Sequence, residues 1–439
     1  MNQALSHLDL QSSSGMTQKT RKRMVMSNRR SLAQLSVWLG QTLVGSITEL
    51  PNDRNLFVFD EGYTEDPDRP VLSLSFYDAE GRLDTNPVPM QMNVAPFFSN
   101  LLPEAELREY VAQRAGVKSV RDLPLLKLLG EDLPGAVVVR AGSDGPPREA
   151  YEDNETPAKL ADESQPLRFS LAGVQMKFSA GGSPERGLTI PAEGRGGHWI
   201  LKLPSEQFPL VPENEHSMMQ FARAVGIETA ETGLVPVGEI ERLPHVFQRA
   251  KSNALWVKRF DRTENTRVHM EDFNQVYGQF PDDKYKNFSY ANMAGDLARI
   301  IGLEAVQEFV RRIVFSAAIG NADMHLKNWT LLYPDGRTPK LSPAYDLVST
   351  IAYIDDFTTA LSLVAKEKDV RNFDEQLLRQ FAEKILVPHR VISDVALETA
   401  ERIMQVWPKI KRDLVMDPHT KERVTERTQI FPLTRKFAV

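Results

Sequence analysis

The chain of 439 residues contains no cysteine. Disulfides and thiolate-ligated metal sites are therefore excluded, and the composition suits a reducing cytosol. No apolar run reaches the roughly 18 residues that a membrane-spanning helix needs. The N-terminus also lacks the apolar stretch of a secretory signal. These absences lead us to expect a cytoplasmic protein that does not enter a membrane.

Two nucleotide-binding signatures are also missing. The sequence Gly-Lys-Ser/Thr occurs nowhere, which excludes a P-loop NTPase. The run Gly-Arg-Gly-Gly at residues 194–197 lacks the strand-then-helix context of a dinucleotide fingerprint. We interpret this run as the tip of a hairpin.

Charge is unevenly distributed along the chain. The net charge is −6, yet residues 1–30 hold six Lys/Arg against one Asp, and residues 411–439 hold seven against four Asp/Glu. The chain between these ends is therefore acidic, which argues against a broad nucleic-acid footprint on it. We expect the basic ends to be solvated tails; contact with a phosphate backbone is the alternative.

Hydrophobic periodicity and breaker residues divide the chain into six segments. Residues 1–32 are expected to be a disordered basic extension, and 33–140 an N-terminal α/β subdomain. The Gly-, Pro- and acid-rich residues 141–167 read as a linker. Residues 168–262 are expected to form a nucleotide-binding lobe, 263–415 a helical catalytic lobe, and 416–439 a basic tail.

The expected secondary structure follows the same patterns. In the first half, strands are expected at residues 35–39, 43–47, 56–59, 72–76 and 136–139, with helices at 97–115 and 125–129. In the second half, strands are expected at 198–204, 234–237, 246–247 and 255–257, with helices at 213–225, 293–301 and 303–319, and helical structure over 374–410. A hairpin is expected from residues 329–333 and 340–342, joined through Pro334-Asp335-Gly336.

The most informative stretch runs from Gly320 to Asp346. It holds Asp323 and Asn328, five residues apart, then the expected hairpin and Asp346. Protein kinases use this spacing, with the first Asp as base and the Asn and second Asp as magnesium ligands. The plainer alternative is a surface loop that carries these residues by chance. We favour a site, because a core-facing helix and a hairpin converge on the three side chains.

A strand lysine lies upstream of this stretch. Lys202 sits in the expected strand 198–204, where it could reach nucleotide phosphates or face solvent on an edge strand. Glu215 lies near the start of the next helix. It could pair with Lys202, but a first-turn Glu favoured by the helix dipole is the more common situation.

Residues 168–179 read Arg-Phe-Ser-Leu-Ala-Gly-Val-Gln-Met-Lys-Phe-Ser. Apolar β-type residues flank Ala172-Gly173, which predicts two strands and a turn. A small-residue turn lets backbone N–H groups approach phosphate, and Ser170 and Lys177 add a hydroxyl and a cation. From the residues alone an ordinary hairpin is the better interpretation. His325, the single His in the Asp323 loop, is interpreted as ordering the loop and not as a metal ligand.

Taken in order, these segments make the chain from about residue 35 to 410 resemble the HipA-type serine/threonine kinase toxins of bacterial toxin–antitoxin pairs. The resemblance is carried by residues 98–103, 169–177, 200–204, 259–262, 323–328 and 343–346. It implies an α+β, two-lobed protein-kinase-like fold with an extra N-terminal α/β subdomain and an all-α C-terminal lobe.

The resemblance also implies ATP and Mg²⁺ as cofactors and assigns roles to individual residues. Asp323 would be the base, Asn328 and Asp346 the metal ligands, and Ser170 the autophosphorylation site whose modification displaces the phosphate loop. Nucleotide contacts would come from the phosphate loop, the strand lysine, the adenine hinge and the catalytic loop: Ala172, Gly173, Val174, Gln175, Met176, Lys177, Lys202, Lys258, Phe260, His325, Lys327 and Tyr345. The hinge assignment belongs to the resemblance, since any exit from a strand has the same periodicity.

For function, the resemblance implies a toxin kinase that phosphorylates a translation component, with glutamyl-tRNA synthetase as the expected substrate, so that growth arrests and persistence follow. A HipB-like helix-turn-helix antitoxin would neutralise it and carry it to operator DNA, with at most minor direct DNA contacts. One alternative is a catalytically weak corepressor subunit, which the basic ends favour slightly. Another is a lipid kinase, against which the lack of membrane-binding segments argues.

Overall fold

The structure is a computed structural model that describes residues 34–142, 145–147, 176–185, 187–190, 196–205, 207–244, 247 and 252–438. The predictions for residues 1–32, for most of the linker, and for Ser170 and Ala172 to Gln175 lie outside these ranges. None of the helices in the described part of the chain is both long enough and apolar enough to cross a membrane.

The N-terminal region is built on an antiparallel sheet in the order β4-β3-β2-β1-β5. Leu35, Val37 and Leu39 of β1 are buried while their neighbours are more exposed, which is the alternation the sequence predicted. Its elements are β1 (Gln34–Leu39), β2 (Thr42–Leu50), β3 (Arg54–Phe59), α2 (Glu61–Glu65), η1 (Leu74–Phe76), β4 (Met90–Gln91), α3 (Pro96–Ser99), α4 (Ala105–Ala115), α5 (Asp122–Leu129) and β5 (Val137–Ala141).

Two expectations for this region were wrong. Residues 72–76 do not form a strand, because the Ser73 hydroxyl caps the 3₁₀ helix η1 and the N–H of Leu74 donates to a Glu271 carboxylate oxygen at 3.0 Å. The single helix expected at 97–115 is two helices, α3 and α4. Pro103 lies between them and restricts the preceding residue to an extended conformation.

A second antiparallel sheet has the order β7-β6-β8-β10-β9. It consists of β6 (Lys177–Ser183), β7 (Gly187–Thr189), β8 (Trp199–Lys202), β9 (Thr232–Pro236) and β10 (Asn253–Lys258), with α6 (Val211–Val225) between β8 and β9 and η2 (Val237–Glu239) after β9. Helix α6 begins with Pro212 in its first turn and ends at Gly226 in the left-handed conformation. Its buried face shares a core with Leu255 and Val257 of β10. Residue 247, expected in a strand, lies in a turn.

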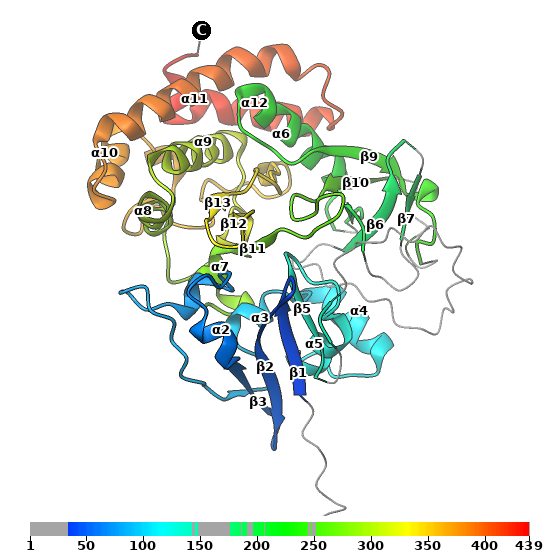
Figure 1. The fold of residues 1–439 in the computed structure, drawn as a ribbon. Coiled ribbons are helices and arrows are strands. Elements are labelled where there is room, and N and C mark those ends of the chain that lie inside the picture. The colour runs from blue at the N-terminus through cyan, green and yellow to red at the C-terminus, as the bar shows by residue number, and fades with distance from the viewer. Residues whose placement is uncertain are drawn as a thin grey trace, which may run out of the picture. The chain divides into compact units, whose positions relative to one another are not determined.

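The C-terminal region is mainly helical and surrounds a small sheet of order β11-β12-β13. It contains β11 (His269–Asp272), α7 (Phe273–Val276), η3 (Pro281–Asp283), α8 (Tyr290–Ile300), α9 (Leu303–Ile319), η4 (Leu326–Asn328), β12 (Thr330–Tyr333), β13 (Lys340–Leu341), η5 (Thr350–Ala352), η6 (Val370–Asn372), α10 (Glu375–Lys384), α11 (His389–Ile410), α12 (Pro418–Ile430) and α13 (Pro432–Arg435). Helix α9 packs against α8 and α11 in the largest hydrophobic core (Figure 1).

The expected basic tail at 416–439 was also wrong. Asp417 caps α12, and Val424, Phe431 and Leu433 are buried in the main core. The guanidinium of Arg427 lies 4.4 Å from the ring centroid of Phe357 and is itself buried. A count of charged residues cannot distinguish a solvated tail from a helix that packs its apolar residues, and the aliphatic part of a charged side chain, against the core.

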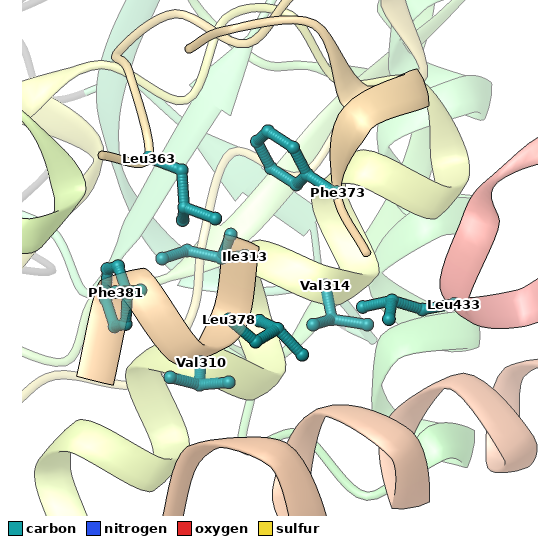
Figure 2. Close-up of a pocket in the computed structure, with 8 residues that line it drawn as sticks. All are labelled: Val310, Ile313, Val314, Leu363, Phe373, Leu378, Phe381 and Leu433. Carbon is teal, nitrogen blue, oxygen red and sulfur yellow. The ribbon is translucent and has the colours of Figure 1, made fainter. Parts of the chain in front are cut away.

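Figure 2 shows a small cavity inside the helical region. Its walls come from α9, α10, α13 and the segments around η6, and it is lined by Val310, Ile313, Val314, Leu363, Phe373, Leu378, Phe381 and Leu433. Every lining side chain is aliphatic or aromatic. We therefore interpret the cavity as a packing defect of the core, because a ligand site needs polar groups to orient its occupant.

Buried polar contacts attach the N-terminal region to the remainder of the described chain. Asp261 accepts hydrogen bonds from Arg259 and from the backbone N–H of Gly135, both at 2.8 Å, and from Arg262 at 2.7 Å. Burial alone would raise the pKa of Asp261, but the two guanidinium groups outweigh it and lower the pKa well below its usual range. The carboxylate therefore joins regions that are 126 residues apart in sequence.

Candidate active site

The site begins where α9 ends. Gly320 terminates the helix with φ +69°, and a Cβ built there would lie 2.6 Å from a side-chain carbon of Ile351. Glycine is therefore required both by the left-handed backbone and by the close approach. In the next residues, the N–H of Asp323 donates to the Asn321 side chain at 3.0 Å, and the N–H of Ala322 donates to Thr350 Oγ1 at 2.8 Å.

Asp323 is held by a tyrosine from outside the loop. The Tyr285 hydroxyl donates to Asp323 Oδ1 at 2.5 Å. Burial raises the pKa of Asp323, and the neighbouring Asp346 carboxylate adds to this rise, while the Tyr285 hydrogen bond opposes it. A carboxylate accepts on both oxygens, so Oδ2 remains able to accept a hydrogen bond from an incoming hydroxyl.

Asn328 and Asp346 meet as the hairpin interpretation required. Strands β12 and β13 lead the chain back, and Asn328 Nδ2 donates to Asp346 Oδ2 at 2.8 Å. Asn328 Oδ1 accepts from the N–H of His325 at 3.0 Å, which fixes the loop around it. Asp346 has φ +60°, a conformation that carboxylate and amide residues tolerate better than most.

Lys202 connects the second sheet to this loop. Its ammonium donates to Glu215 Oε1 and Oε2 at 2.7 and 2.9 Å and to Asp346 Oδ1 at 2.5 Å. Only 7% of Lys202 and 2% of Glu215 is exposed, so Lys202 does not face solvent. Glu215 pairs with Lys202, the interpretation expected to be less common than a first-turn Glu favoured by the helix dipole.

Burial and opposite charge set the protonation of this group. Burial would lower the pKa of Lys202, but Asp346 and Glu215 raise it above its usual value. Burial would likewise raise the pKa of Asp346, yet Lys202 and then Lys177 lower it well below its usual range. Burial raises the pKa of Glu215 to about 7 despite the opposing pull of Lys202. Of the two carboxylates that contact Lys202, Asp346 is therefore the one that stays ionised at neutral pH.

Lys177 supplies a second cation on the neighbouring strand. It is paired in register with Lys202 between β6 and β8. Burial, followed by the like charge of Lys202, lowers the pKa of Lys177 to about 8. Met176 precedes it and packs against both the N-terminal core and the core of the second sheet. The two lysines place positive charge on adjacent strands beside the Asp346 carboxylate.

The residues expected at the adenine hinge behave differently from one another. Phe260 lies 5.5 Å from the ring of Tyr345, whose hydroxyl donates to the carbonyl of Lys327 at 2.7 Å. The Lys258 side chain instead is largely exposed, with its ammonium 3.6 Å from a Glu231 carboxylate oxygen. The structure therefore brings Phe260 and Tyr345 together but turns the Lys258 side chain toward Glu231.

His325 is buried beside the loop, 8% exposed, with its ring edge-to-face with Tyr285 at 5.0 Å. Burial lowers its pKa to about 3. Among the described residues its Nδ1 has no hydrogen-bond partner. The ring is therefore neutral, and its backbone N–H to Asn328 agrees with the interpretation that it orders the loop.

Sequence reasoning missed a contribution from the N-terminal region. Glu104, which follows Pro103 at the start of α4, lies 2.6 Å from Lys327 Nζ and 2.9 Å from Lys284 Nζ. Burial would raise the pKa of Glu104, but the two lysines outweigh it and lower the pKa to about 2. The sequence pattern around residues 98–104 marked this segment, but pairing across about two hundred residues leaves no local signal.

The site has the chemistry that a magnesium nucleotide requires. Asp346 offers carboxylate oxygens and Asn328 an amide oxygen as hard ligands, the two side chains are joined by the hydrogen bond from Asn328 Nδ2, and Asp346 stays ionised. Lys202 and Lys177 offer positive charge opposite them. These residues would hold Mg²⁺ and the phosphates, while Asp323 lies in the same loop.

Two protein-family models match the chain. Residues 35–140 match the HipA N-terminal domain, and residues 169–407 match the HipA-like C-terminal domain. The chain belongs to the HipA family. The resemblance read from the sequence motifs is therefore confirmed.

Individual relatives cover nearly the whole chain. Y4dM of Sinorhizobium fredii, which carries the name of a kinase, is 47% identical over 403 residues, covering 90% of this chain and 96% of its own. The serine/threonine-protein kinase toxin HipA of Shewanella oneidensis is 26% identical over 420 residues, covering 88% and 90%.

A solved structure extends the likeness to the fold. HipA from Shewanella oneidensis, in a complex with HipB and its operator DNA, superposes with a TM-score of 0.69 at 21% identity and covers 92% of this chain and all of that chain. The expected α+β class, with a kinase-like arrangement and a helical C-terminal region, is thereby confirmed.

Proposed function

We propose that this HipA-family chain is a serine/threonine protein kinase that uses ATP and Mg²⁺. The observation that carries the proposal is the convergence on Asp346 of Lys202, at 2.5 Å, and of Asn328, at 2.8 Å, the latter from the loop that also holds Asp323. The names of its relatives as kinases support the same activity.

The chain's own residues would divide the work as follows. Bound Mg-ATP supplies the phosphoryl group and the divalent charge. Asp346 and Asn328 would hold the metal, and Lys202, kept in place by Glu215, would hold phosphate oxygens. Asp323 accepts the proton of the attacking serine or threonine hydroxyl on Oδ2, while Tyr285 keeps the carboxylate oriented through Oδ1.

The wider role follows from the relatives. The relative from Shewanella oneidensis is named a serine/threonine-protein kinase toxin. The similar solved structure from that organism contains HipA, HipB and operator DNA. We propose a toxin role for this chain in the cytoplasm, neutralisation by a HipB-like antitoxin, and DNA contact through that antitoxin. We further propose glutamyl-tRNA synthetase as substrate, persistence as outcome, and Ser170, outside the described residues, as the autophosphorylation site.

Two substitutions test the kinase proposal. Asp346→Asn should abolish the magnesium-dependent part of ATP affinity in calorimetry, because it removes the charged metal ligand. Asp323→Asn should lower the phosphorylation rate roughly 10²–10⁴-fold, as for a positioned base, and leave nucleotide affinity largely intact.

The control is Asp413→Asn, at an exposed position beyond α11. Unchanged magnesium-dependent affinity in Asp346→Asn, or a full rate in Asp323→Asn, would contradict the assignments. If the wild-type protein phosphorylates neither serine substrates nor itself, the corepressor alternative gains. That alternative has lost some of its basis, since Lys421, Arg423, Arg427 and Arg435 belong to the packed helices α12 and α13.

A further inference from the structure

We propose that Glu104 is a positioning residue for the catalytic loop, so that the N-terminal region completes the kinase site. The inference rests on the kinase function proposed above. It assigns a role in the reaction to a residue outside both kinase-like lobes, the N-cap residue of α4 that follows Pro103.

The geometry of Glu104 is that of a bridge. Its two carboxylate oxygens contact two different ammonium groups, Lys327 Nζ at 2.6 Å and Lys284 Nζ at 2.9 Å. The Glu104 side chain is 13% exposed, and the two lysines are 6% and 8% exposed. Charged contacts of this length in a largely buried setting restrain both partners far more than surface ion pairs do.

The bridge reaches both groups that flank the reaction. Lys327 directly precedes Asn328, and Lys284 directly precedes Tyr285, whose hydroxyl donates to Asp323. The backbone carbonyl of Lys284 also accepts from the N–H of Leu326 at 3.2 Å. One carboxylate therefore ties the loop that carries the metal ligand to the segment that orients the base.

Docking of the N-terminal region does not depend on this charge. Asn100, in the same segment, donates to the carbonyl of Gln279 at 2.8 Å and accepts from Asn274 Nδ2 at 2.9 Å. These neutral contacts remain when Glu104 is neutralised. Loss of the Glu104 charge should leave Lys327 with its hydrogen bond to the carbonyl of Asn100 at 3.2 Å, but it removes the carboxylate that compensates the charge of both buried lysines.

The test compares Glu104→Gln with Glu106→Gln, which removes the same charge from an exposed position in the first turn of α4. In the nucleotide-free protein, hydrogen exchange at residues 321–328 should speed up in Glu104→Gln only. With substrate, kcat should fall roughly 10–100-fold while KM for ATP changes little, because misplacement by about 1 Å costs that much.

A double-mutant cycle measures whether the rate losses of the Glu104 and Lys327 variants are coupled, which a general loss of stability would not produce. If Glu104 acts through Lys327, Glu104→Gln combined with Lys327→Gln should be no slower than the worse single variant. Multiplied losses, or unchanged hydrogen exchange with unchanged kcat, would overturn the proposal. Should Glu104→Gln fail to fold, Glu104→Asp keeps the charge but is too short to span both lysines, and serves for the same comparison.

The two proposals fail in distinguishable ways. An inactive wild-type protein whose loop still loosens in Glu104→Gln would refute the kinase function and keep the bridge. If the wild-type protein is an active kinase and Glu104→Gln changes neither kcat nor hydrogen exchange, the kinase function stands and the role of Glu104 is refuted.

Discussion

Replacing Lys202 by Met tests whether the buried charge group holds the two lobes together. The ammonium contacts Glu215 at 2.7 Å and Asp346 at 2.5 Å, so the two carboxylates lie within about 5 Å of each other. Without the cation, two charged carboxylates at this separation would repel by about 3 kcal/mol at an effective dielectric constant of about 20, and because the pKa of Glu215 is already raised to about 7, uptake of a proton by Glu215 relieves part of this cost. Adding the lost hydrogen bonds, we expect Lys202→Met to lower the free energy of unfolding by about 3–5 kcal/mol.

Urea unfolding followed by tryptophan fluorescence measures this loss. Lys340→Met, at an exposed position on β13, is the matched control and should change stability by less than about 0.5 kcal/mol. The double variant with Glu215→Leu should recover much of the loss, since an apolar pair replaces a carboxylate left without its cation. A Lys202→Met variant within about 1 kcal/mol of wild type, or a double variant no more stable than the single one, would refute the reasoning.

Two further predictions concern the framework of the site. Burial lowers the pKa of His269 to about 4, so between its ordinary value near 6.5 and pH 4 the unfolded chain binds a proton that the folded chain does not. The contribution of His269 to the unfolding free energy should therefore fall by about 2 kcal/mol from pH 7 to 5, in wild type and in the exposed-histidine control His419→Gln. His269→Gln should lack this part of the fall; an unchanged pH profile would contradict it. Gly320→Ala should cost more stability than Gly116→Ala, about 1 kcal/mol or less for the latter. Both glycines end helices at positive φ, but only at Gly320 does the added Cβ meet Ile351. Equal losses in thermal unfolding would show that this contact relaxes without cost.

The sequence could predict elements whose signals are local. The apolar stripe of α9, its ending at Gly320 and the turn at residues 334–336 all lie within a few residues of what they determine. The convergence of Asn328 and Asp346 followed from them, because a hairpin of that length has few ways to return. Helix α9 itself was predicted with its observed bounds.

The remaining features depend on partners far away in the chain. Glu215 near the start of a helix looks the same whether it faces solvent or a lysine, and only the packing of α6 against β10 decides. Arg427 appears as one charge in a basic tail, whereas in the structure α12 carries it onto the ring of Phe357. Propensity and charge describe neighbours in sequence, whereas these roles come from tertiary contacts.

The bonding of Asp346 suggests an order of events at the site. One carboxylate oxygen of Asp346 accepts from Lys202 and the other from Asn328, and each oxygen keeps a second lone pair, so a cation that takes Asp346 as a ligand would compete with the Lys202 ammonium for the same negative charge. Lys202 can leave because Glu215 accepts it through two further hydrogen bonds, at 2.7 and 2.9 Å. Once Lys202 has left Asp346, its ammonium lies beside the like charge of Lys177 and needs a further negative group nearby. Phosphates supply that negative charge, whereas a metal ion alone does not. Metal and nucleotide should therefore bind together. The phosphates would compensate the charge of Lys202, and the metal ion would compensate the charge of Asp346.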